Sequence, residues 1–221
     1  MSDIIREIDE ELRRERLQKL WERYGLYVVG AALLVVLGVA GWRGWEWYVS
    51  REAAKAGARF ETALELAEAN KRTEADELLA ALTKDAPAGY ALLARLRAAA
   101  EIAERDKAAG AAAYDALAND PSVEPTLRDL AQVRAALALV DSASPAEIAS
   151  RLEPLIAANS AFRPSAREIL GLARVRAGEA EAARKLFAEV LTDPETPPAM
   201  RSRAQLMLAL LAGSEVAPAT Q

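Results

Sequence analysis

Few side chains in this sequence are of the types that carry out enzymatic chemistry. Its 221 residues include no cysteine and no histidine. This excludes disulfides, thiolate metal sites and cysteine nucleophiles, and it removes the commonest metal ligand and general base. Two pairs of nearby carboxylates, Asp76 with Glu77 and Glu179 with Glu181, could in principle act as acid and base. Acid pairs on alanine-rich amphipathic helices usually belong to a solvated face, so a carboxylate-dependent hydrolase is the weakest alternative.

Sequence motifs for cofactors are missing as well. The chain contains no phosphate-binding loop, dinucleotide-binding glycine pattern or metal-ligand cluster, and no spacing of serine and lysine indicates a nucleophile with its base. A net charge of −5 argues against nucleic acid, which would require a basic face. We therefore predict no enzyme, no cofactor, no metal and no catalytic residue, which leaves binding and scaffolding.

The longest apolar stretch is residues 24–42, without a charge between Arg23 and Arg43. A helix of these 19 residues, rising ~1.5 Å per residue, would be about 28 Å long, close to the ~30 Å hydrocarbon thickness of a bilayer. Because the backbone has no water partners in lipid, such a stretch must be helical. We predict one transmembrane helix. The alternatives are a buried core helix and a cleaved signal peptide; the acidic residues before the stretch and the tryptophans after it argue against the signal peptide.

Aromatic residues flank the apolar stretch on both sides, as expected where side chains lie at the membrane–water interface. The predicted interface residues are Trp21, Tyr24, Trp42, Trp45, Trp47 and Tyr48. Residues 9–23 contain five lysines or arginines, whereas residues 43–57 contain three. By the positive-inside rule the N-terminus lies in the cytoplasm and the large domain outside it.

From residue 51 onward the chain is rich in alanine and leucine, which favours helices throughout. Short Pro, Gly, Asn and Asp segments interrupt the helical pattern, and no stretch shows strand alternation. The predicted breaks lie at residues 70–73, 85–89, 106, 119–124, 141–145, 159–164, 176–179 and 193–198. We predict an all-α domain whose last helix covers residues 199–212.

The predicted helices repeat with a regular spacing. Similar ladders of apolar residues followed by an Asp, Asn or Pro begin at Leu78, Tyr114, Leu152 and Phe187, which are 36, 38 and 35 residues apart. Helix pairs at this spacing form an α-solenoid, in which each pair buries its apolar face against its neighbours. The predicted organisation is a cytoplasmic amphipathic arm (1–23), a transmembrane helix (24–42), an interfacial aromatic segment (43–50), a repeat domain (51–212) and a disordered tail (213–221).

A helix–turn–helix unit of this length resembles the tetratricopeptide repeat. The best copy, residues 166–194, has Leu170-Gly171, a turn at Gly178, then Ala183, Phe187 and Pro194, although the usual tryptophan and tyrosine of the first helix are missing. The layout of the whole chain resembles the YfgM-like family, ancillary subunits of the bacterial Sec translocon. The resemblance implies an inner-membrane protein with a periplasmic domain and, as partners, the Sec translocon and periplasmic chaperones acting on emerging secretory proteins.

We expect a protein-interaction scaffold of the cell envelope; a scaffold for another envelope assembly, such as cytochrome maturation or cell division, is the alternative. In stacked helix pairs the first helix of each pair lines the concave face, where partners bind. Counting back from the ladders predicts a partner groove at Leu92, Arg95, Leu130, Val133, Glu168, Leu172 and Arg176. This mixture suits a peptide with apolar anchors and a few orienting charges. In the alternative interpretation the leucines and Val133 are ordinary core and the charges face water.

Overall fold

The computed structural model describes the backbone of residues 2–216 and the side chains of residues 21–27 and 29–213. All regular structure in this part of the chain is helical. Its helices are α1 (Ser2–Glu68), α2 (Arg72–Asp85), α3 (Ala88–Arg105), α4 (Lys107–Ala118), α5 (Pro125–Leu139), α6 (Pro145–Ala157), α7 (Arg163–Arg176), α8 (Ala180–Thr192) and α9 (Pro198–Val216). Every predicted break coincides with an interruption between consecutive helices, and the all-α solenoid is confirmed.

The ends of three helices show why the breaks were visible in the sequence. Asn70, Asn159 and Gly178 follow α1, α6 and α7 with positive φ angles of 61°, 55° and 78°, a conformation that glycine and asparagine tolerate best. The amide of the next residue in each case donates to a carbonyl of the last helical turn, at 2.8 to 3.0 Å. This is the Schellman arrangement, which satisfies carbonyls that the helix leaves unpaired.

Helix starts follow equally local rules. The Asp106 carboxylate accepts hydrogen bonds from the amides of Ala108 and Ala109, at 2.9 and 3.0 Å, and so caps α4. The Ser144 hydroxyl accepts one from the Glu147 amide at 3.2 Å and caps α6. Proline occupies the first or second position of α5, α6 and α7, where its missing N–H has no cost.

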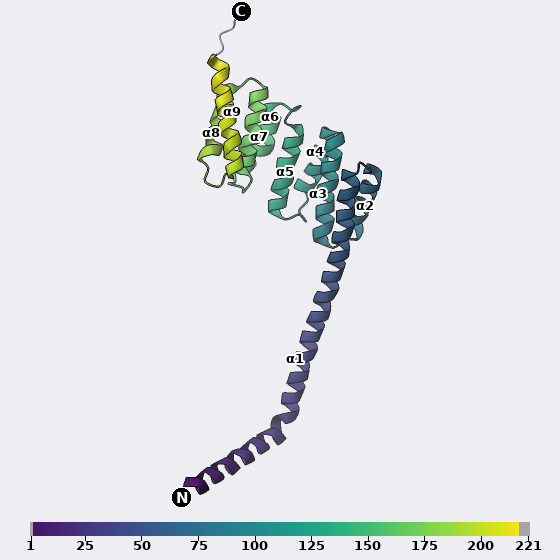
Figure 1. Ribbon diagram of the computed structural model, residues 1–221, viewed down its shortest axis with the longest axis vertical. Coiled ribbons are helices and arrows are strands. Elements are labelled where there is room, and N and C mark those ends of the chain that lie inside the picture. Colours follow the sequence, from purple (N-terminus) through teal and green to yellow (C-terminus); the bar gives the residue numbers. More distant parts are fainter. Residues whose placement is uncertain (1, 217–221) are drawn as a thin grey trace, which may run out of the picture. The chain divides into compact units, whose positions relative to one another are not determined.

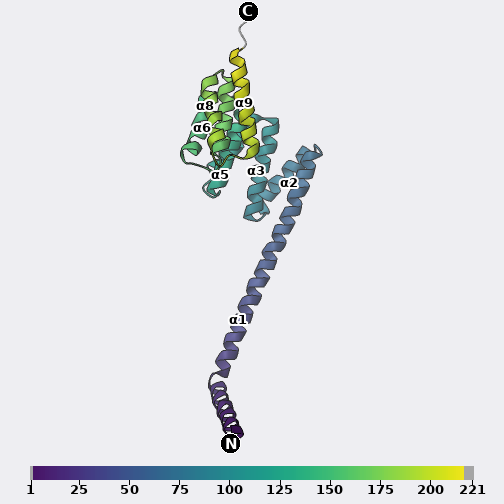
Figure 2. The same cartoon turned by 60° about the vertical axis from the view of Figure 1, so that its left-hand side comes forward.

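By its packing the chain divides into two units, Met1–Lys55 and Ala56–Gln221. In the second unit, consecutive helices from α2 to α9 lie against one another, and α5 also packs directly on α7. Figure 1 shows this succession from α2 to α9, and Figure 2 shows the same helices in a turned view. The contact between α5 and α7 is what first helices of neighbouring pairs make in an array of this kind.

Four separate clusters of buried side chains form the core of the second unit, one for each predicted ladder. Tyr114, Leu152 and Phe187 are each buried in their own cluster together with the residue three positions later. The first ladder is shifted by one position from the prediction: Leu79 is fully buried, whereas Leu78 packs at the edge of its cluster. Neighbouring residues of a helix are ~100° apart, so two consecutive leucines can both border a broad apolar stripe, and the sequence pattern alone did not show which one is at its centre.

The last helix is longer than predicted. It extends through Val216, so residues 213–216, assigned to the disordered tail, are helical. Residues 217–221, the rest of that tail, lie outside the described residues.

In the first unit, residues 2–55 are a single uninterrupted part of α1, so the arm and the apolar stretch are continuous. Trp21–Glu68 is long and apolar enough to cross a membrane. Within residues 24–42, the apolar side chains that the structure describes are exposed; Leu26 is 85% and Leu34 72% accessible. Such exposure does not fit the alternative of a buried core helix, because no described residue covers these side chains.

Candidate functional site

A cavity of about 420 Å³ lies among α5, α7 and α9. We call it the α5–α7–α9 cavity. Its floor is formed by Val133 and Ile169, which are only 6% and 5% exposed and also belong to the core between α5 and α7. Its apolar walls come from Leu130, Leu137, Phe162, Leu172 and Met200. Concave, largely apolar sites with a few polar groups are where proteins bind ligands and peptides.

Three charged side chains border this cavity; two of them are hydrogen-bonded to each other and the third is not hydrogen-bonded to any described residue. Arg203 on α9 donates two hydrogen bonds to the Glu168 carboxylate on α7, at 2.7 and 2.8 Å. These bonds raise the pKa of the Arg203 guanidinium above its usual value. The side chain of Arg134 on α5 is exposed and makes no hydrogen bond or ion pair with any residue that the structure describes. One positive charge of the cavity is therefore available to a partner.

The structure brings four of the seven predicted groove residues together at this cavity: Leu130, Val133, Glu168 and Leu172. Leu130 and Leu172 are half-buried, as expected of a groove wall, whereas Val133 is core, as the alternative interpretation predicted for it. Whether the cavity binds a partner stays a prediction.

The other three predicted groove residues lie elsewhere. Leu92 packs against the core of α3, α4 and α5. The Arg95 guanidinium forms an ion pair with Asp120 at 2.8 Å, and that of Arg176 donates to the Ala143 carbonyl in the turn before α6. Arg95 thus pairs with the loop between α4 and α5, and Arg176 with the loop between α5 and α6. Both side chains are therefore less available to a partner than the sequence suggested.

The contribution of α9 was missed at the sequence level, although a signal for it existed. Arg203 follows Glu168 by 35 residues, which is the repeat spacing found between the last two ladders. Extending the count by one more first helix would have placed Met200 and Arg203 beside the groove. No ladder follows the last helix, so counting back from the ladders predicted no groove residue on it.

Three of the four carboxylates considered for acid–base chemistry accept hydrogen bonds from arginines. Asp76 accepts a hydrogen bond from Arg105 at 2.6 Å, and Glu181 accepts one from Arg184 at 2.6 Å. Glu179 accepts one from Arg174. None of these carboxylates lines the α5–α7–α9 cavity. Within the described residues, no group of three or more Asp or Glu is placed to hold a metal ion.

The predicted membrane-interface residues are all exposed on α1. The exposed fractions are 62% for Trp21, 48% for Tyr24, 74% for Trp42, 70% for Trp45, 63% for Trp47 and 56% for Tyr48. An arginine lies over an aromatic ring at each end of the apolar stretch. The guanidinium of Arg23 is 5.8 Å from the ring centre of Tyr24, and that of Arg51 is 5.1 Å from that of Trp47. Tyrosine, tryptophan and arginine side chains of this kind suit the headgroup level of a bilayer.

Comparison with known proteins adds two matches. The sequence model of the family described as "Tetratricopeptide repeat-like domain" matches residues 18–210. A protein of Haemophilus influenzae named "Ancillary SecYEG translocon subunit" is 30% identical over 97 residues, which are 42% of this chain and 48% of that protein. The chain thus spans about half the length of this curated relative. No solved structure matches the chain.

The family match extends over the apolar part of α1 and over helices α2 to α8, and it ends within α9. It therefore covers every buried residue of the four clusters except Leu211, and every residue of the α5–α7–α9 cavity. Together with the translocon-associated relative it confirms the resemblance to the YfgM-like family. The chain belongs to the tetratricopeptide repeat-like domain family.

Proposed function

We propose that this chain is a non-enzymatic scaffold, anchored in the inner membrane by α1, that binds protein segments in the α5–α7–α9 cavity close to a Sec translocon. The observation that carries the binding role is the cavity itself: half-buried leucines from successive first helices surround a space of about 420 Å³, with an exposed arginine at its edge. Helical repeat arrays use this face for partners. The translocon is proposed as the location because the Haemophilus influenzae relative bears that name.

The arrangement of charges along α1 supports an anchor whose N-terminus is cytoplasmic. Five basic residues lie within residues 9–23, before the apolar stretch, and three lie within residues 43–57, after it. By the positive-inside rule the repeat domain is then in the periplasm. There it would meet secretory proteins and their chaperones as they emerge. Protease added to spheroplasts should degrade the repeat domain and spare the arm; complete protection of the domain until lysis would reverse this topology.

The binding role can be tested by photocrosslinking in membranes. A photoreactive amino acid at Leu137, which borders the cavity and is 44% exposed, should crosslink to translocon subunits or to secretory chains. Leu93 is a matched control, because it is also a leucine, is 47% exposed on α3 and does not line the cavity. Equal crosslinking from both positions, or crosslinks to unrelated envelope proteins, would contradict the proposal.

A further inference from the structure

A second, smaller cavity adjoins the first. It measures about 150 Å³ and is lined by residues of α3, α4 and α5, among them Ala100, Ala103 and Ala138. Arg134 and Leu137 border both cavities. The two hollows are therefore neighbours along one face of the second unit, and these two α5 side chains form the ridge between them.

The two cavities differ in volume and lining. The larger is walled by leucines, Phe162 and Met200, which suit a bulky aliphatic or aromatic side chain. The smaller is lined by three alanines, Leu137 and Tyr114, beside the charged side chains of Glu104, Lys107 and Arg134. Its lower volume suits a smaller apolar group. A segment lying across the ridge would thus place a large apolar side chain in the larger cavity, on one side of Arg134, and a smaller apolar side chain in the smaller cavity, on the other side.

The charges along this face leave Arg134 as the group that selects a partner. Glu168 is held by Arg203 through two hydrogen bonds, so this pair offers no net charge. At the far edge of the smaller cavity, Glu104 and Lys107 have opposite signs. Arg134 remains as the excess positive charge, in a chain whose net charge is −5. A charge at the rim of a binding site chiefly governs which partner is accepted and how fast it associates.

Building on the proposed function, we propose that the partner is a peptide segment in which a single carboxylate lies between apolar side chains. The carboxylate pairs with Arg134 on the ridge, and the apolar side chains enter the two cavities. A lysine or arginine at the same position of the segment is rejected, because two like charges would meet beside apolar walls.

The test uses the full-length protein in nonionic detergent and three synthetic peptides. The peptides are identical, with leucines and alanines on both sides of a central residue that is Glu, Gln or Lys. We expect the Glu peptide to bind about tenfold more tightly than the Lys peptide, with the Gln peptide between them; tenfold corresponds to about 1.4 kcal/mol. Arg134→Glu should reverse this order, and Arg134→Gln should remove the preference.

Arg72→Glu is the matched control variant. Arg72 is an exposed arginine on α2 that makes no ion pair with any described residue and lines neither cavity, so its reversal changes the net charge equally. It should leave the order of the peptides unchanged. Since Arg134 and Arg72 are both exposed, both variants should fold, which circular dichroism verifies.

A photoreactive amino acid at Leu137 separates failure of this proposal from failure of the proposed function. Peptides that crosslink there but bind with equal affinity overturn the carboxylate preference and leave the binding cavity intact. If no peptide crosslinks or binds, both proposals are overturned. A binding assay with anionic vesicles tests the alternative that Arg134 binds lipid. If Arg134→Glu abolishes vesicle binding and leaves peptide binding unchanged, Arg134 binds a lipid surface and the peptide proposal is wrong.

Discussion

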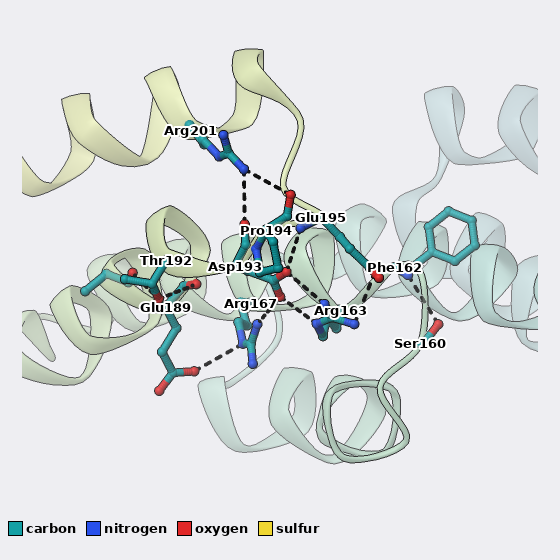
Figure 3. A network of polar contacts seen from close by, with 11 residues as sticks. Ser160, Phe162, Arg163, Arg167, Glu189, Thr192, Asp193, Pro194, Glu195 and Arg201 are labelled. Atoms are coloured by element: carbon teal, nitrogen blue, oxygen red, sulfur yellow. Dashed lines mark hydrogen bonds and ion pairs between the residues drawn. The ribbon is translucent and has the colours of Figure 1, made fainter.

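Arg163, the first residue of α7, holds Asp193, the residue that follows α8, through two hydrogen bonds of 2.5 and 2.8 Å. Their side chains are only 9% and 4% exposed. Arg167, one turn further along α7, donates to the same carboxylate at 2.7 Å, and the Glu195 amide donates to it at 3.0 Å. Figure 3 shows the network, in which Asp193 lies between the two arginines. The loop between α8 and α9, and with it the α9 side of the cavity, is thereby fixed to α7.

Asp193→Asn should destabilise the protein by ~3 kcal/mol, because it leaves two arginines partly buried without their shared counter-charge. Urea unfolding of the full-length protein, followed by circular dichroism, measures this. Asp85→Asn is the control, since Asp85 pairs with Arg59 on the surface and its side chain is 57% exposed; it should cost about 0.5 kcal/mol or less. An equal loss of unfolding free energy in the two variants would mean that burial does not make the Asp193 ion pairs more stabilising than a surface pair.

Stability should fall in acid over a defined pH range. The hydrogen bonds from Arg163 lower the pKa of Asp193 from 3.8 to about 2. Because the pKa of Asp193 is lower in the folded state than in the unfolded state, its ionised carboxylate stabilises the folded protein. This stabilisation is fully present above about pH 4 and is lost as the pH falls towards about 2. Urea midpoints measured across this range should decline less steeply for Asp193→Asn than for wild type. The decline should not vanish, since the hydrogen bonds from Ser122 likewise lower the pKa of Asp120 to about 2.

Arg95→Glu should destabilise the protein. Arg95 pairs with Asp120 at 2.8 Å and contributes to the lowered pKa of that carboxyl, so a glutamate there would place two carboxylates side by side. Arg95→Gln, which removes the pair without adding repulsion, should melt at a temperature between those of wild type and Arg95→Glu. A melting temperature for Arg95→Glu equal to that of wild type would contradict the pairing.

The fold was predictable from the sequence because its determinants are local. Asn70, Asn159 and Gly178 end helices through their own backbone conformations, and Asp106 and Ser144 begin helices through bonds to the next turn. The repeating ladders then fixed which face of each second helix is buried, to within the one-residue shift at Leu79. Each of these signals lies within a few residues of the feature that it determines.

The site was only partly predictable, because its geometry depends on how successive first helices are rotated against one another. Leu130 and Leu172 line the α5–α7–α9 cavity, whereas Arg95 and Arg176, chosen by the same count, pair with Asp120 and Ala143. Whether an arginine on a first helix forms an ion pair or a hydrogen bond depends on which loop of a neighbouring helix pair lies beside it. Periodicity gives the face of a helix, and it does not give the rotation between helices.

Gly171 and Phe187 provide a sharp test of how α7 and α8 pack. Phe187 is fully buried, and a Cβ atom added to Gly171 would lie 2.9 to 3.2 Å from three carbons of its ring. Phe187→Ala should cost about 3–5 kcal/mol, the usual range for a buried phenylalanine. Gly171→Ala should cost about 1–3 kcal/mol, because the methyl group forces the ring out of its position. Both follow from urea unfolding of the full-length protein.

The two positions should also be coupled. In a Phe187→Leu background, the added methyl group at Gly171 meets a shorter and more flexible side chain, so Gly171→Ala should cost less than it does in the wild type. Gly89→Ala is the control: nothing lies within 4 Å of its Cβ position on α3, and alanine is the better helix former there, so this change should be neutral or slightly stabilising. Identical costs of Gly171→Ala in the two backgrounds would show that the aromatic ring does not set the distance between α7 and α8.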